Sequence, residues 1–286
     1  MNEPLLTVEK LCVAFPGSGG SRQAVRDVNL RVGREKVGIV GESGSGKSTT
    51  GRAILKLLPP KAKVSATRLQ FETTDIMAAT ERQMQQIRGA RISMILQDAK
   101  FSLNPLIPVG KQIAEAYRIH RSAPKGEARR EALAMLEAVH IRDPERVFKL
   151  YPHEVSGGMG QRIMIAMMLI PEPALIIADE PTSALDVMVR RQVLAILDEL
   201  VTARGAGLIF ISHDLNLVAE FCDRVLVMYA GRIMEELPAS HLEQARHPYT
   251  RALLDSLPRL ERPVDELIVP TRDPAWLDGP VAYGDS

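Results

Sequence analysis

The sequence is poor in cysteine, and its apolar runs are short. The two cysteines, Cys12 and Cys222, lie far apart and lack the spacing of a metal site. Such sparse thiols are typical of a reducing compartment, so we expect both to be reduced and half-buried in a cytosolic protein. The longest apolar runs, such as residues 174–178 and 207–211, have the length of strands, whereas a membrane-spanning helix needs ~20 residues. We therefore expect no membrane-spanning segment.

The first residues also lack a basic segment followed by an apolar core, so we expect no secretory signal. If the protein acts at a membrane, a partner must hold it there. Neither charge is in excess, because 36 Lys and Arg oppose 35 Asp and Glu, which leaves a net charge of +1. This balance excludes a broad basic surface for nucleic acids. A composition that is 45% hydrophobic and 25% charged excludes a disordered or fibrous chain.

The first part of the chain has the pattern of strands. Alternating apolar residues predict strands at 5–15 and 25–32, and a short apolar strand is predicted at 36–40. Residues 48–58 are predicted to form a helix that ends before Pro59. These elements predict a small antiparallel sheet followed by the first strand and helix of an α/β core.

Residues 104–168 have helical periodicity, with Leu133, Leu136 and Val139 on one face. Beyond them, apolar strands alternate with helices again, which indicates βαβ units and a mostly parallel sheet. We therefore predict an α/β core that is interrupted by a helical insertion. The tail after about Pro258 is rich in Pro, Asp and Arg, and we expect it to be irregular.

A glycine-rich segment follows the strand predicted at 36–40. Residues 41–49 contain the pattern G-x-x-x-x-G-K-[ST] and lie between a predicted strand and a predicted helix, as a phosphate-binding loop must. Its glycines let backbone N–H groups turn toward phosphate oxygens, and the helix N-terminus adds partial positive charge. The alternative is a glycine-rich turn without a ligand. We expect the phosphates to be bound by Gly41, Ser43, Gly44, Ser45, Gly46, Lys47, Ser48 and Thr49.

Two acids follow the apolar residues 175–178. Asp179 and Glu180 would lie at the carboxyl edge of the sheet, where α/β proteins bind ligands. Asp179 would hold Mg²⁺ through water, and Glu180 would polarise the attacking water in phosphoryl transfer. Such a pair alone is usually a solvated turn, but with the phosphate loop it predicts a P-loop ATPase or GTPase. The chain has no Asn-Lys-x-Asp guanine-recognition motif, which argues against a GTPase.

Residues 151–162, YPHEVSGGMGQR, lie between these two motifs. They closely resemble the signature of the ATP-binding-cassette (ABC) ATPases, and four further elements of that family occur in order. These are an aromatic residue, Phe15; a glutamine loop, Gln97; a loop after the second acid, 183–186, with Asp186; and a switch histidine, His213. The resemblance covers roughly residues 5–257, and it implies a P-loop NTPase core of the RecA-like type.

The resemblance also implies roles for these residues. Phe15 would stack on adenine, although an aromatic at a strand end is commonly a core residue. Gln97 would sense the γ-phosphate or the metal, so that Ser48, Gln97 and Asp179 form the Mg²⁺ set. Glu180 and His213 would be the catalytic residues, with His213 in contact with the γ-phosphate, and Asp186 would lie in the loop between subunits. The residues that close on the partner subunit's nucleotide would be Ser156, Gly157, Gly158 and Gln161.

Three stretches resemble the peptide and nickel importers of this family: residues 102–105, 151–154 and 247–254. The resemblance implies ATP and Mg²⁺ as ligands. It also implies a second ATPase subunit, more often a paralogue than a second copy, and two membrane permeases that contact this chain near 97–104. An extracytoplasmic binding protein would act indirectly. Nucleic acid is not expected, and the place of action would be the cytoplasmic face of the inner membrane.

Some positions depart from the family pattern. Ala99 replaces a common proline, Gly160 a common arginine and Val155 a common leucine. Longer members carry a four-cysteine iron–sulfur segment in the tail, and no cysteine follows Cys222 here, so we expect no cluster.

The expected organisation is one nucleotide-binding domain, 1–257, with a helical subdomain at about 98–168 and a short extension, 258–286. The leading prediction is the ATP-hydrolysing subunit of a bacterial di- or oligopeptide importer. A nickel or metallophore importer remains an alternative, and so does a cassette ATPase without a role in transport. A regulatory cassette without activity is disfavoured because Lys47, Glu180 and His213 are all present.

Overall fold

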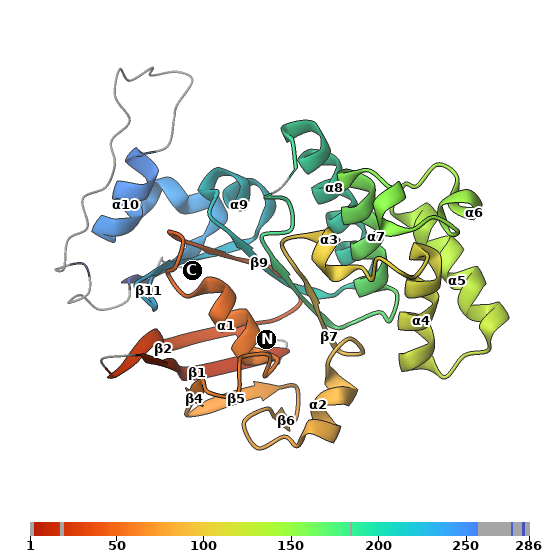
Figure 1. Ribbon diagram of the computed structural model, residues 1–286. Coiled ribbons are helices and arrows are strands. Elements are labelled where there is room, and N and C mark those ends of the chain that lie inside the picture. Colours follow the sequence, from red (N-terminus) through yellow and green to blue (C-terminus); the bar gives the residue numbers. More distant parts are fainter. Residues whose placement is uncertain (1–2, 18–19, 184, 257–275, 277–281, 284–286) are drawn as a thin grey trace. The chain divides into compact units, whose positions relative to one another are not determined.

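The computed structural model describes residues 3–17, 20–183, 185–256, 276 and 282–283 (Figure 1). The chain divides into two compact units. The first unit comprises Met1–Ala78 and Ile209–Ser286, and the second comprises Ala79–Leu208. The extension predicted at 258–286 lies almost wholly outside the described residues.

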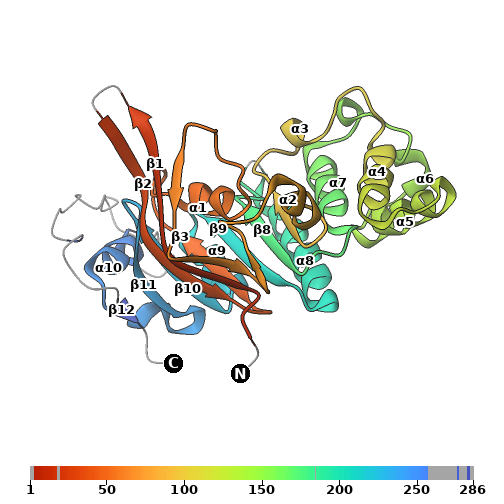
Figure 2. The same ribbon diagram turned by 90° about the horizontal axis from the view of Figure 1, so that it is seen from below.

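The first unit contains an antiparallel sheet at its N-terminal end, as predicted. Its longest strands are β1 (Leu6–Gly17) and β2 (Gly20–Val32), which run side by side (Figure 2). Buried apolar residues face each other across this pair, because Val8 lies opposite Leu30 and Leu11 opposite Val28. Such cross-strand pairs stabilise a sheet. The remaining strands of this sheet are β4 (Lys63–Ser65), β5 (Arg68–Phe71) and β6 (Thr74–Asp75).

The second sheet of the first unit supports the glycine-rich loop. Its strands lie in the order β12–β11–β10–β3–β9, and β3 and β10 are parallel, whereas β10 and β11 form an antiparallel hairpin. The predicted strand at 36–40 is confirmed as β3, but the β10–β11 hairpin was not predicted. Strand β9 starts in the second unit and ends in the first. The bounds are β3 Lys36–Val40, β9 Gly207–Ser212, β10 Arg224–Tyr229, β11 Arg232–Pro238 and β12 Ala282–Tyr283.

Helices cover both sheets of the first unit. Helix α1 contacts β1 and β2, α9 packs on β3, and α10 packs on β11. The helix predicted at 48–58 is wrong at its C-terminal end. Helix α1 ends at Ile54 because Lys56 adopts a left-handed conformation (φ 50°) and the Leu57 N–H turns back to the Arg52 carbonyl. The helices are α1 Lys47–Ile54, α9 Leu215–Phe221 and α10 Pro248–Asp255, with a 3₁₀ segment at Ala239–Gln244.

The second unit is built around helix α7. This helix contacts α3, α4, α5, α8 and strand β7, so it is buried over most of its surface (Figure 1). Two parallel strands, β7 (Ile92–Ile95) and β8 (Leu175–Asp179), belong to the same unit. The helices are α2 Glu81–Ile87, α3 Ala99–Ser102, α4 Val109–Arg121, α5 Lys125–Ala138, α6 Pro144–Val147, α7 Gly157–Leu169 and α8 Val187–Arg204, with a 3₁₀ turn at Pro152–Glu154.

Two predictions about burial need correction. On the predicted helical face, Leu136 and Val139 are fully buried as expected, whereas Leu133 is only half-buried. Ala132 and Met135 complete the buried face of α5 instead. Cys12 is half-buried as predicted, but Cys222 is buried with its sulfur close to Gly38 of β3, and burial raises the pKa of its thiol to about 12. Both thiols are free.

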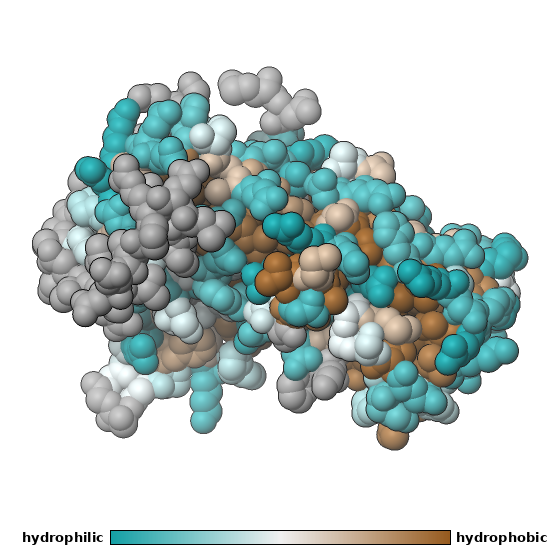
Figure 3. All heavy atoms as spheres, turned by 90° about the horizontal axis from the view of Figure 1, so that it is seen from above, coloured by the Kyte–Doolittle hydropathy of each residue, from teal (hydrophilic) through white to brown (hydrophobic). Residues whose placement is uncertain are grey.

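The surface is mainly hydrophilic on the face drawn in Figure 3, with hydrophobic residues in separate patches. Among the described helices, none has both the length and the apolar composition required to cross a bilayer. Large exposed apolar side chains are Leu57, Leu106, Ile119, Tyr151, Val187 and Met188.

A substitution of Phe210 tests the packing of the core in the first unit. Its ring is fully buried in β9 and packs 4.9 Å from the ring of Phe221. We expect Phe210→Ala to lower the free energy of unfolding by about 3–5 kcal/mol, since it leaves a cavity. Urea unfolding followed by the fluorescence of Trp276, the single tryptophan, measures this change in the first unit.

The matched control is Leu57→Ala, because Leu57 is 48% exposed and lies in the same unit. Its effect should stay within about 0.5 kcal/mol. Equal shifts in the two urea midpoints would contradict this description of the core.

Candidate functional site

The glycine-rich loop joins β3 to α1, with the predicted strand and helix on either side of it. Gly41 (φ 152°) and Gly46 (φ 107°) both have backbone conformations that other residues rarely adopt. A Cβ at position 41 would lie 2.0 Å from the Met228 carbonyl oxygen, and one at position 46 would lie 2.6 Å from that of Ala24. The loop is therefore packed so closely against neighbouring backbone that only glycine fits at these positions.

Lys47, the first residue of α1, is almost fully buried, with 4% of its surface exposed. Its Nζ donates hydrogen bonds to the carbonyl oxygens of Gly41 (2.8 Å) and Glu42 (2.9 Å). Burial of an ammonium group is costly unless the group is hydrogen-bonded, so these carbonyls hold the charge inside the loop. The lysine is thus placed at the loop by the loop's own backbone.

The loop also presents groups that suit an anion. Ser45 is 4% exposed, and its buried Oγ has no hydrogen-bond partner among the described residues. The N-cap residue of helix α1 is Gly46, which has no side chain to cap the helix, and the first turn contains no acidic residue. An unsatisfied hydroxyl and an uncapped helix N-terminus together favour phosphate oxygens. Of the other predicted phosphate-binding residues, Ser43 and Gly44 are exposed, and Ser48 and Thr49 are half-buried.

A tyrosine distant in sequence also contacts this loop. The backbone N–H of Glu42 donates to the Tyr249 hydroxyl oxygen at 3.2 Å. Tyr249 lies in α10 and is fully buried, with its ring 4.5 Å from that of Tyr229 and 5.4 Å from that of Trp276. Tyr249 is not among the predicted site residues. It lies in the motif at 247–254, which indicated only the resemblance to the importer group.

His247 positions the start of α10. As the N-cap residue, it accepts a hydrogen bond from the Tyr249 N–H at Nδ1 (3.2 Å). The buried carboxylate of Glu235 accepts the backbone N–H groups of Arg246 (2.6 Å) and His247 (3.2 Å). Burial lowers the pKa of His247, and this effect outweighs the opposing influence of Glu235. The histidine is therefore favoured in its neutral form, which the cap requires.

Two further predicted residues belong to the first unit. Phe15 lies near the end of β1 with a half-buried ring. His213 directly follows β9 and is exposed, and the next residue, Asp214, caps α9 by accepting the Leu217 N–H at 3.1 Å. Their roles toward a nucleotide stay predictions.

In the second unit, the two acids end strand β8. Asp179 is the last residue of the strand and is 4% exposed, whereas Glu180 is half-buried with a left-handed backbone (φ 49°). The carbonyl of Glu180 accepts both the N–H (3.3 Å) and the hydroxyl (3.2 Å) of Ser183. The Gln161 side-chain amide donates to the Pro181 carbonyl. These bonds fix the turn that presents Glu180.

Ser156 starts helix α7. Its Oγ accepts the Met159 N–H at 3.3 Å, which is the bond of an N-cap. A Cβ at Gly157 would meet no atom within 4 Å, whereas one at Gly158 would lie 2.7 Å from Cγ1 of Val189 in α8. The glycine at 157 therefore leaves the helix N-terminus open, and the glycine at 158 lets α8 approach closely.

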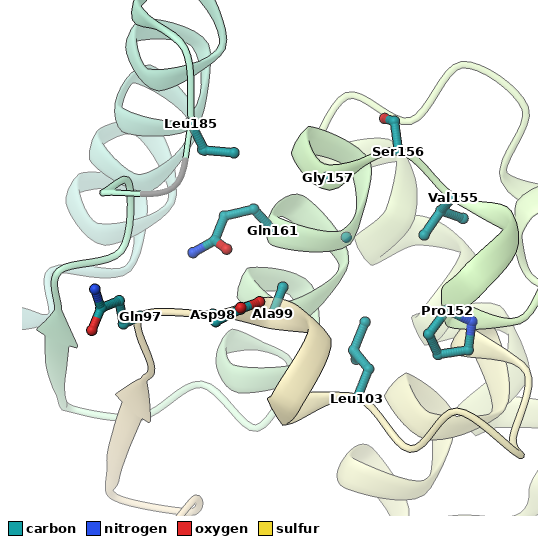
Figure 4. Close-up of a pocket in the computed structure, with 11 residues that line it drawn as sticks. Gln97, Asp98, Ala99, Leu103, Pro152, Val155, Ser156, Gly157, Gln161 and Leu185 are labelled. Carbon is teal, nitrogen blue, oxygen red and sulfur yellow. The ribbon is translucent and has the colours of Figure 1, made fainter.

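A cavity of about 190 Å³ brings four of the predicted residues together (Figure 4): Gln97, Ser156, Gly157 and Gln161. Gln97 is exposed just after β7, and the Gln161 amide extends from α7 toward the segment that carries Gln97 and Asp98. Asp186 is not among the lining residues. It caps α8 by accepting the Val189 N–H at 3.0 Å, and Ala184 in the same loop lies outside the described residues.

The predicted residues therefore form two groups, one in each unit. Phe15, the loop at 41–49 and His213 belong to the first unit. The second unit carries Gln97, Ser156, Gly157, Gly158, Gln161, Asp179, Glu180 and Asp186. Within the described residues, no cluster of three or more His, Cys, Asp or Glu side chains has the arrangement of a metal site.

The family model described as "ABC transporter" matches residues 25–183. This match covers more than half of the chain, and it includes the glycine-rich loop, the signature helix and the two acids. The chain belongs to the ABC transporter family, and it is an ATP-binding cassette of that family.

Within this family, the chain is similar to ATP-binding proteins of peptide transport. It is 47% identical over 262 residues to the dipeptide transport ATP-binding protein DppD of Bacillus subtilis. The aligned residues cover 91% of this chain and 78% of DppD. It is 45% identical over 277 residues to the oligopeptide transport ATP-binding protein OppD of Salmonella typhimurium. This alignment covers 96% of this chain and 82% of OppD.

Two solved structures have the same fold. The dimeric structure of a bacterial ABC transporter cassette matches with a TM-score of 0.73 and 26% identity, over 82% of this chain and 98% of that chain. A post-hydrolysis dimer of the same cassette, bound to ADP and phosphate, matches with a TM-score of 0.72 and 26% identity over the same shares. These comparisons confirm the predicted P-loop NTPase fold, with its antiparallel N-terminal sheet and mostly parallel main sheet.

The cap formed by His247 predicts a pH dependence of stability. Protonation at Nδ1 would remove the acceptor of the Tyr249 N–H, and the folded-state pKa is lowered from 6.5. The contribution is therefore fully present above pH 6.5 and decreases as the pH falls toward the lowered folded-state value. Urea unfolding followed by Trp276 fluorescence from pH 7.5 to about pH 5.5 measures the slope.

The control variant is His247→Asn, which retains an N-cap acceptor but does not titrate. The free energy of unfolding should depend less on pH in this variant than in the wild type. Identical slopes for the two proteins would show that His247 does not contribute to the pH dependence.

Proposed function

We propose that the chain is the ATP-binding and ATP-hydrolysing subunit of a bacterial importer for di- and oligopeptides. The observation that carries this proposal is the glycine-rich loop. Two of its glycine positions leave no room for a side chain, the buried Ser45 hydroxyl has no hydrogen-bond partner among the described residues, and Lys47 is buried. Membership of the ABC transporter family supports the reaction, in which ATP and water give ADP and phosphate.

ATP binds through its phosphates at the loop. Backbone N–H groups at the start of α1 and the Lys47 ammonium neutralise the β- and γ-phosphates, and Ser45 gains the partner that it lacks. Phe15 stacks on the adenine ring with the exposed part of its side chain. The phosphate contacts come from Gly41, Ser43, Gly44, Ser45, Gly46, Lys47, Ser48 and Thr49.

Ser48, Gln97 and Asp179 would hold Mg²⁺, Asp179 through water. All three side chains carry oxygen donors, which are the ligands that Mg²⁺ prefers, and Asp179 ends β8 as a buried carboxylate. When bound, the ion supplies neutralisation of the phosphate charge. The chemistry of the donors therefore fits the ion.

Glu180 acts on the attacking water, and His213 contacts the γ-phosphate. Phosphoryl transfer depends mainly on positioning and charge stabilisation, so a carboxylate on a fixed turn is suited to orienting a water molecule. The fixed turn results from the bonds of Ser183 to the Glu180 carbonyl and of Gln161 to the Pro181 carbonyl.

The active unit is a pair of cassettes. The open N-terminus of α7, with Ser156, Gly157 and Gly158, contacts the nucleotide of the partner subunit together with Gln161, and Asp186 lies between the subunits. The dimeric structures of a related cassette support this arrangement. The partner is a paralogue rather than a second copy, as in the importer group that the sequence resembles.

The pair acts at the cytoplasmic face of the inner membrane beneath two permease subunits, and an extracytoplasmic binding protein supplies the substrate. Peptides are favoured over nickel or metallophores because similar proteins are named for dipeptide and oligopeptide transport. ATP binding closes the pair and hydrolysis opens it, which couples the reaction to a two-state movement.

The variant Glu180→Gln tests the hydrolytic role. The variant should bind ATP with the affinity of the wild type. Its steady-state rate of ATP hydrolysis should fall by at least about a hundredfold, because the amide cannot act as a base on water. Phosphate release and ATP titration calorimetry measure the two quantities. The control is Glu172→Gln, an exposed acid of the same unit that pairs with Arg121, and it should hydrolyse ATP at the wild-type rate. Wild-type turnover in Glu180→Gln would refute the role.

Affinity purification from detergent-solubilised membranes tests the importer assignment. We expect a second cassette subunit and two permease subunits to be recovered with the tagged chain. Identification of these partners by mass spectrometry, compared with an untagged strain, provides the measurement. Recovery of the chain without membrane proteins in repeated purifications would favour a cassette ATPase without a role in transport.

A further inference from the structure

One peptide group of the phosphate loop is held at both ends. This group joins Gly41 to Glu42. Its carbonyl oxygen, on Gly41, accepts a hydrogen bond from Lys47 Nζ at 2.8 Å. Its N–H, on Glu42, donates to the Tyr249 hydroxyl oxygen at 3.2 Å. Because a peptide group is planar, a bond that fixes the direction of the N–H also fixes the direction of the carbonyl.

We propose that Tyr249 is a positioning residue for ATP binding: it orients the Gly41–Glu42 peptide, and through that peptide it orients the ammonium of Lys47. The inference rests on the proposed function, in which Lys47 binds the phosphates. Tyr249 itself contacts the backbone of the loop and needs no contact with the nucleotide.

This peptide group needs an external support. Gly41 lacks a side chain and has a φ of 152°. A glycine restricts the orientation of the peptide plane that follows it less than any other residue does. A rotation of that plane would turn the Gly41 carbonyl away from Lys47. The ammonium would then lose one of the two loop carbonyls that hold it in its buried place.

Tyr249 is suited to this task because its own position is fixed. The side chain is fully buried, and its ring packs against the rings of Tyr229 (4.5 Å) and Trp276 (5.4 Å). Its backbone N–H is bound by His247 Nδ1 at the start of α10. The hydroxyl is therefore presented to the loop from a rigid part of the core.

Strand β10 connects the two sides of this contact. The carbonyl of Met228 lies where a Cβ of residue 41 would be, and the next residue, Tyr229, packs its ring on Tyr249. The same strand end thus restricts the backbone of the loop and the ring that supports it. A shift of α10 relative to β10 would change the position of the hydroxyl at the Glu42 N–H.

The test compares the ATP dissociation constants of four proteins by titration calorimetry: wild type, Tyr249→Phe, Lys47→Ala and the double variant. Tyr249→Phe retains the ring and removes the hydroxyl. We expect it to weaken ATP binding about three- to tenfold, the range that follows from the loss of one neutral hydrogen bond. In the Lys47→Ala background the same change should have no further effect, because its action passes through Lys47.

The matched control is Tyr229→Phe, which removes a hydroxyl from the adjacent ring and leaves the bond between Tyr249 and Glu42 in place. It should bind ATP as the wild type does, and urea unfolding of both tyrosine variants, followed by Trp276 fluorescence, shows that each is folded. Wild-type affinity in Tyr249→Phe, equal weakening in Tyr229→Phe, or additive losses in the double variant would overturn the inference. Unchanged ATP binding in Lys47→Ala alone would instead overturn the proposed function.

Discussion

The placement of one buried cation determines much of the structure around the site. Lys47 lies at the start of a helix and is 4% exposed, and burial of its ammonium group is costly without hydrogen-bond acceptors. The acceptors are the carbonyls of Gly41 and Glu42, so the loop must curl around its own lysine. This curl brings the backbone against the carbonyls of Ala24 and Met228, which is why glycine is required at positions 41 and 46.

The same constraint connects distant parts of the first unit. Strand β10 limits the space at Gly41, and α10 supplies the hydroxyl that meets the Glu42 N–H. The anchoring of α10 by His247 and Glu235 is therefore part of the support of the loop, although none of these residues belongs to a nucleotide-binding motif. In the second unit, Gln161 and Ser183 hold the turn after β8 in a comparable way, through bonds to backbone carbonyls.

Local sequence patterns were sufficient for the parts of the fold that depend on local interactions. Strand β3, the glycine-rich loop and the start of α1 follow from an apolar run, glycines and a helix-forming segment, and strand β8 with its two acids follows in the same way. Periodicity was less accurate where tertiary packing decides. The end of α1 depends on the left-handed conformation of Lys56, and α5 buries Ala132 whereas the neighbouring Leu133 is only half-buried.

The support of the loop by Tyr249 could not be predicted from the sequence, because the contact joins residues separated by 207 positions and involves a backbone N–H, which carries no residue-specific signal. The most direct test of the account is a calorimetric titration of the wild-type chain with ATP and, separately, with AMP. We expect binding of one ATP per chain and far weaker binding of AMP, which lacks the β- and γ-phosphates that the loop and Lys47 hold. Equal affinity for the two nucleotides, or no binding of ATP, would contradict it.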